Sequence, residues 1–196
     1  MRIWPGSSYP LGAAWDGKGV NFAIYSENAT SISLLLYESQ NSPTPRHRIP
    51  LTEKSGYVWH CYLPDIMPGQ LYAYSVDGPY EPDKGLRFNK KKALIDPYSR
   101  AITGTIPTND AMFGHKLGDP TQDLSRDERD SGPFSPKSLI IDSRYDWEGD
   151  SLLRTPWNET VIYETHVKGF TKLHPGIPRK KEALMLDSLL RKSFAT

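Results

Sequence analysis

Residues 68–79 read Pro68-Gly69-Gln70-Leu71-Tyr72-Ala73-Tyr74-Ser75-Val76-Asp77-Gly78-Pro79, a short alternating segment between two turn signals. Leucine, alanine and serine alternate with two tyrosines and a valine, and this period of two places the two sets on opposite faces of a strand. Pro-Gly and Asp-Gly-Pro are residues that form turns. The segment therefore predicts one half-buried strand of an antiparallel sheet.

Upstream segments have the same length and the same period. Residues 20–25, 32–36 and 57–63 each alternate in polarity or in size and are rich in aromatic or β-branched side chains. Turn signals such as Asp16-Gly17 and Ser42-Pro43 separate them. Short strands spaced about ten residues apart predict an all-β fold, a β-sandwich.

The composition excludes several classes of function. Among the 196 residues, 24 are basic and 23 acidic, so the basic excess of a nucleic-acid or anionic-membrane binder is absent. One cysteine, Cys61, excludes an intrachain disulfide framework. Apolar runs such as residues 34–37 are far shorter than the roughly 20 residues of a membrane helix, and the first residues lack the apolar region of a signal peptide. We expect a cytoplasmic location, with no nucleic-acid or membrane partner.

The character of the chain changes after Pro79. Residues 79–138 are rich in Pro, Gly, Asp and Lys, with little periodicity, and predict solvated loops with short strands. Residues 137–142 and 160–167 again have the composition of strands, and the second of these follows Pro156.

No catalytic or metal site emerges from residue spacing. The five histidines and Cys61 lack the spacing of metal ligands, and phosphate-binding and Gly-x-Ser-x-Gly motifs are missing, so we expect no metal or cofactor. Glycoside hydrolysis needs two neighbouring carboxylates. Glu164 is the best-placed single carboxylate, and Asp142, Asp146 and Glu148 lie beside a turn, but no two of them are paired by the sequence.

Aromatic side chains offer a binding chemistry instead. An exposed set could form a flat platform on which sugar rings stack through their C–H faces. The alternative is that these rings fill the sandwich core. The set comprises Trp59, Tyr62, Tyr72, Tyr74 and Tyr80.

Collinear motifs between residues 4 and 178 carry a family resemblance. They begin with Tyr9-Pro10-Leu11-Gly12-Ala13, continue through residues 68–74, 77–80, 87–89 and 94–98, and end with residues 146–150 and 161–171. In this order they resemble the opening of bacterial glycogen debranching enzymes and of isoamylases, in glycoside hydrolase family 13. The set is far more specific than any single piece.

The resemblance implies a domain organisation. Residues 1–105 would form an immunoglobulin-like (E-set) sandwich of the type called carbohydrate-binding module 48, followed by a linker and loop region at 106–155. Residues 156–178 would begin an incomplete (β/α)8 barrel, with 160–167 as its first strand. The family's barrel hydrolyses α-1,6 branch linkages of glycogen or amylopectin-like glucan with an aspartate nucleophile and a glutamate acid/base.

Those catalytic carboxylates lie on later barrel strands, so no residue of this chain inherits their roles and Glu164 is not assigned one. The resemblance therefore implies an inactive N-terminal fragment of a glycogen debranching enzyme. A free-standing glucan-binding module is the alternative, and an interaction or scaffold protein is a third reading, supported by composition alone.

The resemblance also suggests where glucan would bind. Glycogen-binding relatives carry a lysine in the strand before the Asp-Gly turn and a tryptophan just after it, and these positions match Ala73 and Tyr80. We expect weak binding of α-glucan at Tyr80, Trp59 and Tyr74, strengthened by Ala73→Lys. The alternative role for the sandwich is to brace the barrel.

Residues 179–196 depart from the resemblance. Relatives continue with Arg-Gly-Thr-Tyr-Ala-Gly-Leu, whereas residues 182–188 read Glu-Ala-Leu-Met-Leu-Asp-Ser. The nucleotide string CGAGGCACTTATGCTGGACTCT encodes the first peptide in one frame and the second when shifted by one base. This coincidence predicts a frameshift near codon 179 and an out-of-frame tail over 179–196.

Overall fold

A computed structural model describes residues 1–105 and 108–172 of the protein. The chain divides into two units, Met1–Tyr145 and Asp146–Thr196. Within the described part of the chain, no helix is long and apolar enough to cross a membrane.

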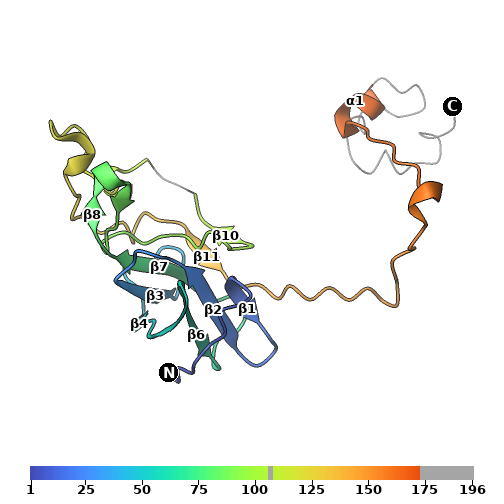
Figure 1. Ribbon diagram of the computed structural model, residues 1–196, viewed down its shortest axis with the longest axis horizontal. Coiled ribbons are helices and arrows are strands. Elements are labelled where there is room, and N and C mark those ends of the chain that lie inside the picture. The colour runs from blue at the N-terminus through green and yellow to red at the C-terminus, as the bar shows by residue number, and fades with distance from the viewer. Residues whose placement is uncertain (106–107, 173–196) are drawn as a thin grey trace. The chain divides into compact units, whose positions relative to one another are not determined.

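The first unit is a sandwich of two antiparallel sheets (Figure 1). One sheet has the order β1-β2-β6-β5, formed by Gly12–Trp15, Val20–Tyr25, Val58–Leu63 and Glu53–Ser55. The other has the order β10-β11-β7-β3-β4, formed by Ile102–Thr103, Lys137–Leu139, Leu71–Asp77, Ser31–Tyr37 and His47–Pro50. The prediction of an all-β sandwich is confirmed.

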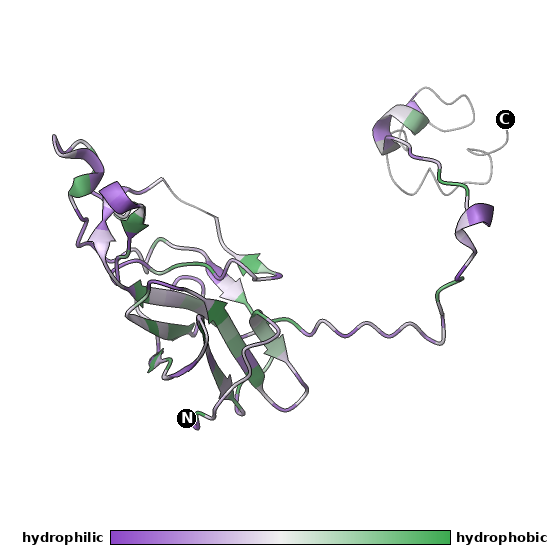
Figure 2. Ribbon diagram, viewed as in Figure 1, coloured by the Kyte–Doolittle hydropathy of each residue, from purple (hydrophilic) through white to green (hydrophobic). Residues whose placement is uncertain are grey.

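Short elements complete this unit. The hairpin β8–β9 (Tyr80–Glu81 and Leu86–Arg87) encloses the 3-10 turn η1 (Pro82–Lys84). Two further 3-10 turns, η2 (Asp110–Met112) and η3 (Gln122–Leu124), lie in the segment after β10. Figure 2 shows hydrophobic positions mainly in the strands and hydrophilic ones mainly in the connecting loops.

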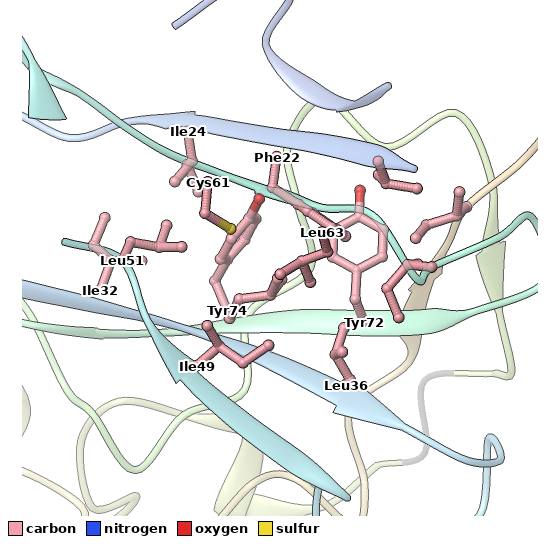
Figure 3. Packing of buried hydrophobic residues seen from close by; sticks show 14 of the residues in the cluster. Phe22, Ile24, Ile32, Leu36, Ile49, Leu51, Cys61, Leu63, Tyr72 and Tyr74 are labelled. Carbon is pink, nitrogen blue, oxygen red and sulfur yellow. The ribbon is translucent and has the colours of Figure 1, made fainter. Parts of the chain in front are cut away.

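The core lies between the two sheets, as the period of two requires. Phe22 of β2 contacts Tyr72 of β7 edge to face at 5.3 Å, and Tyr72 contacts Tyr74 in the same way at 5.9 Å. Figure 3 shows the two tyrosines pointing from β7 toward Phe22, Cys61 and Leu63 of the facing sheet. Each such side chain stabilises the fold by about 1.5–3 kcal/mol through burial.

A third layer covers the outer face of β7. Ala73 and Leu71 are buried there against Ala93 and Leu35 in a second apolar cluster. Beside it, the fully buried Lys137 ammonium donates to the carbonyls of Gly132 and Ser135 and lies 4.5 Å from the centroid of the Tyr37 ring. Burial lowers the pKa of Lys137.

The segment 79–138 forms short strands, β8, β9 and β10, as predicted, but the expectation that it is solvated is wrong for the parts that pack on β7, such as the buried Ala93. The strand predicted over 137–142 is confirmed by β11, which pairs with β7 through Ser138↔Tyr72 and Leu139↔Leu71, because the β7 edge not bonded to β3 needs backbone partners. The compact unit consequently continues to Tyr145, beyond the expected sandwich boundary at residue 105.

The second unit contains the 3-10 turn η4 (Trp157–Glu159) and the helix α1 (Val167–Lys172). The expected strand over 160–167 is not formed: residues 161–166 belong to no strand and their side chains are exposed. A parallel barrel strand depends on hydrogen-bonded neighbours, and the described residues pair no strand with this segment. Its place as a first barrel strand stays a prediction. The barrel start beyond residue 172 and the tail at 179–196 lie outside the described residues.

Candidate functional site

A cavity of about 580 Å³ lies where β2, β3 and β7 meet the β8–β9 hairpin and the segments 92–97 and 112–115. This volume is within the usual range of small-molecule sites. Most of its wall is apolar, contributed by Ile24, Ile32, Val76, Leu86, Phe88 and Met112.

The turn after β7 brings the hairpin to the cavity. A Cβ atom on Gly78 would lie 2.7 Å from the Phe88 ring, so only glycine allows the ring to approach the turn this closely. Gly85, with φ of 79°, closes η1 and leads into β9. Tyr80 and Phe88 both line the cavity as a result.

Asp123 fixes the outer edge of the cavity. The Tyr80 hydroxyl donates to the Asp123 carbonyl oxygen at 2.7 Å. The Arg87 guanidinium donates to Asp123 Oδ2 at 3.0 and 2.6 Å and holds the pKa of that carboxyl below its ordinary value. The Tyr80 ring is therefore held in one place while it stays half-buried.

Two polar residues of the wall use their polar atoms inside the protein. Lys92 Nζ donates to Asp127 Oδ1 at 3.0 Å and to the carbonyls of Ala111 and Arg129 at 2.8 and 2.9 Å. Asn89 Nδ2 donates to the Asp127 carbonyl at 2.7 Å. The Lys92 ammonium and the Asn89 amide therefore stabilise the wall of the cavity. Hydrogen bonds to a ligand would have to come from other side chains.

His115 and Arg87 provide the remaining polar character of the wall. The His115 ring contacts Phe113 at 6.1 Å, is half-buried, and has no side-chain hydrogen bond to the described residues. None of the described residues that line the cavity is Asp or Glu. Because glycoside hydrolysis needs two carboxyl groups about 5–10 Å apart, this arrangement can bind a ligand but lacks hydrolytic groups.

The three predicted glucan-binding residues do not share one surface. Tyr80 lies at the cavity, as described above. Tyr74 also contributes to its wall but is fully buried, with its hydroxyl unpaired within the described structure. Its burial between the sheets raises its pKa well above the ordinary value. The expectation that Tyr74 offers an exposed platform is therefore wrong, because its side chain is on the core face of β7.

Trp59 lies on β6 and is not itself a cavity-lining residue, although it contacts Ser26, which is one. Its indole Nε1 donates to the Ser26 carbonyl at 3.2 Å, and Lys54 Nζ lies 4.8 Å from its ring centroid. The side chain is half-buried and packs against the core. The lysine covers a ring face that a sugar would otherwise contact.

Ala73 also differs from the expectation. It is fully buried under the third layer, beside Ala93. The ammonium group of a lysine at this position would be buried, because the third layer separates position 73 from solvent. The expected gain in binding from Ala73→Lys is therefore incompatible with the structure.

Of the other acidic residues singled out from the sequence, Asp142 belongs to the first unit, and Asp146, Glu148 and Glu164 belong to the second, where Asp146 Oδ1 accepts from the Glu148 backbone N–H at 2.9 Å. Asp142 accepts from Arg144 at 2.9 Å, and Glu164 is exposed in the extended part of the second unit. No cluster of three or more His, Cys, Asp or Glu side chains able to hold a metal occurs among the described residues.

Sequence reasoning missed Phe88, Arg87 and His115 as cavity residues, because it assigned their segment to solvated loops. Arg87-Phe88-Asn89 is itself one of the motifs of the family resemblance. The presence of this motif could have indicated that residues 87–89 belong to the folded domain and not to a solvated loop.

The chain is similar in sequence to one protein family and to several longer proteins. Residues 10–99 match the family described as carbohydrate-binding module 48 (isoamylase N-terminal domain). The glycogen debranching enzyme of Erwinia tasmaniensis is 46% identical over 178 residues, which cover 91% of this chain and 26% of that enzyme. A glycogen operon protein GlgX homolog of Mycobacterium tuberculosis is 43% identical, over 90% of this chain and 24% of the relative.

Among solved structures, the pullulanase from Bacillus acidopullulyticus superposes with a TM-score of 0.54 at 19% identity, over 92% of this chain and 18% of that protein. This likeness supports the fold alone. The chain spans about a quarter of the length of the curated relatives it matches.

Proposed function

We propose that the chain is the N-terminal part of a glycogen debranching enzyme and that its sandwich, whose residues 10–99 match the family described as carbohydrate-binding module 48, binds α-glucan. One observation carries this proposal. About nine-tenths of the chain is similar to a segment that makes up about one quarter of the length of a relative named glycogen debranching enzyme. The activity proposed for the whole enzyme is hydrolysis of α-1,6 branch linkages, in the cytoplasm where glycogen is stored.

The cavity supports the binding part of the proposal. Tyr80 and Phe88 provide aromatic surface for the C–H faces of glucosyl rings, and Arg87 and His115 provide donors for hydroxyl oxygens. Few polar groups of the wall are free, so we expect low affinity, with a Kd on the order of 0.1–1 mM.

The same geometry argues that this chain does not hydrolyse glucan by itself. The cavity wall lacks the acid/base and nucleophile carboxylates described above. Purified chain should therefore release no reducing ends from glycogen, amylopectin or pullulan above a buffer control. Turnover that follows the protein through purification and is lost in Glu164→Ala would contradict this proposal.

Calorimetric titration with maltoheptaose tests the cavity. Tyr80→Ala should abolish binding at the cavity, whereas Tyr80→Phe keeps the ring and should retain it. Tyr163→Ala is the matched control, because Tyr163 is 72% exposed and does not line the cavity. Equal binding by wild type and Tyr80→Ala, at every site resolved, would refute the cavity as a glucan site.

A second role, bracing of a barrel, is favoured by a specific observation. Large apolar side chains in η4 and on both sides of it are exposed: Leu153 by 93%, Trp157 by 81% and Val161 by 93%. The relatives are about four times as long as this chain, and the equivalent residues there could pack against the remaining three quarters of the protein. Co-expression with the remaining three quarters of the Erwinia tasmaniensis relative should yield a complex, which Leu153→Asp with Val161→Asp should disrupt.

A further inference from the structure

The outer face of the first sheet carries a second groove, of about 480 Å³, which the proposed cavity site does not include. Tyr62 of β6 lies opposite Asn21 of β2 in the ladder, and both alternate with core residues, so their side chains are on the outer face. The segment 5–10 forms the wall of the groove beside them.

This wall is held in place by the backbone and by Asn21. Trp4 and Tyr62 exchange backbone hydrogen bonds of 2.9 Å in both directions. The Asn21 amide accepts from Ser7 N at 2.7 Å and donates to the Ser7 carbonyl at 2.9 Å. Gly6 lies so near β6 that a Cβ there would be 2.6 Å from the Cys61 carbonyl carbon. The groove is thus preformed.

Aromatic rings line this groove and remain accessible. Tyr9 is 80% exposed, and Tyr62 is half-buried. Trp4 stacks on Tyr62 with 5.7 Å between ring centroids and 19° between planes. Trp4 thus covers one face of the Tyr62 ring and fixes its orientation, while the exposed Tyr9 ring and the accessible part of Tyr62 offer apolar surface to the C–H face of a sugar.

Asp16 adds a hydrogen-bond acceptor at the same place. Its Oδ1 accepts from the backbone N–H groups of Lys18 and Gly19 at 2.8 and 2.9 Å, and the Tyr62 hydroxyl donates to its Oδ2 at 3.0 Å. The two backbone N–H groups hold the pKa of Asp16 below its ordinary value. The carboxylate is exposed and keeps further lone pairs for hydroxyl donors.

We propose that this groove is a second glucan site, in which Tyr9 and Tyr62 stack against glucosyl rings and Asp16 accepts from sugar hydroxyls. The inference rests on the proposed function, glucan binding by the sandwich, and adds a site at a different face. A negative carboxylate beside aromatic rings suits a neutral polyhydroxyl chain and repels phosphate-bearing ligands.

The test is a titration of maltoheptaose into isotopically labelled chain 1–196, followed by amide NMR shifts and by calorimetry. Wild type should show two sites, one of which moves the amides of Ser7, Asn21 and Tyr62. Tyr80→Ala should leave that site intact. In the Tyr80→Ala background, Tyr9→Ala and Asp16→Asn should each raise its Kd by about threefold to tenfold.

Both variants should fold normally. Tyr9 is largely exposed, and an asparagine at position 16 keeps an oxygen for the Lys18 and Gly19 N–H groups. Tyr163→Ala is the control for loss of an exposed tyrosine elsewhere, since Tyr163 is 72% exposed. An unchanged melting temperature and unchanged binding in this control would support a local effect.

Three outcomes would overturn the groove site, and they differ in what they say of the proposed function. If Tyr80→Ala removes all glucan binding, the groove site is refuted while glucan binding by the sandwich stands. If wild type binds no glucan at all, both proposals fail. If Tyr9→Ala weakens only a complex with the remainder of the enzyme, the groove is a protein contact and the glucan site is refuted.

Discussion

Replacing Lys92 by methionine tests whether the buried ion pair beneath the cavity holds the third layer on the sandwich. The Lys92 and Asp127 side chains are 5% and 2% exposed, and their charged atoms are 3.0 Å apart. Methionine keeps most of the apolar stem but donates no hydrogen bond. The carbonyls of Ala111 and Arg129, which accept from Lys92, would then lose this donor.

The size of the effect follows from burial. Removing one partner of a buried pair costs about 3–5 kcal/mol. In the variant, Arg129 Nε still donates to Asp127 at 2.9 Å, so the buried carboxylate keeps one positively charged partner. We therefore expect a loss at the lower end of this range, about 3 kcal/mol. For a domain of this size, that loss lowers the melting temperature by roughly 6–12 °C.

Urea unfolding followed by tryptophan fluorescence measures the free energy of unfolding. Lys90→Met is the matched control, because Lys90 pairs with Asp77 at 3.2 Å while it is 59% exposed, and surface pairs contribute about 0–1 kcal/mol. If Lys92→Met is no more destabilising than Lys90→Met, the ion pair does not hold the third layer and our account of the cavity wall is wrong.

The pH dependence of stability gives a second readout of the same pair. The Arg129 guanidinium and then the Lys92 ammonium hold the pKa of Asp127 well below its usual range. A depressed folded-state pKa adds stability above the unfolded value, near pH 4, and this stability is lost as the pH falls toward the folded value. Wild type should therefore lose stability between about pH 5 and pH 2, and Asp127→Asn should reduce that loss.

Three further predictions concern packing. Ala73→Lys would bury an unpaired ammonium under the third layer, so it should destabilise the sandwich by about 3 kcal/mol or more in urea unfolding. It should also fail to strengthen maltoheptaose binding, and a stable, tighter-binding variant would contradict the burial argument. Gly78→Ala would press a methyl group on the Phe88 ring and should lower stability by about 1–3 kcal/mol, whereas Gly114→Ala is the matched control, because Gly114 likewise has no positive φ and has open space at its Cβ. Burial raises the pKa of the Cys61 thiol to about 12, so maleimide at pH 8 should label it slowly in native protein and rapidly in urea; equal rates would show that the thiol is accessible.

Local pattern was sufficient for the sheets that form the core. Alternation in residues 20–25, 57–63 and 71–76 predicted strands β2, β6 and β7, because a strand with one buried face must alternate in polarity or size. The collinear motifs also identified the family that residues 10–99 match. Alternation alone did not decide which aromatic residues of a strand face solvent, since Tyr72 and Tyr74 are both large and both amphipathic.

Long-range contacts decided the candidate sites. Ala73 is buried only because residues more than 15 positions away fold over β7, and Ser131 Oγ anchors that cover by accepting from Ala93 N at 2.9 Å. The segment 160–167 has the composition of a strand, yet no described strand pairs with it.

The sequence by itself determined the strands β2, β3, β6 and β7, the core face of β2 and the family resemblance of residues 10–99, since each of these depends on neighbouring residues or on ordered motifs. Only the tertiary structure decided that Tyr80 meets Phe88 and His115 at a cavity and that Tyr9, Asp16 and Tyr62 share a groove. The physical reason is that a binding site is formed by residues distant in sequence, whose proximity is set by strand pairing and by the packing of a loop layer that has no periodic pattern.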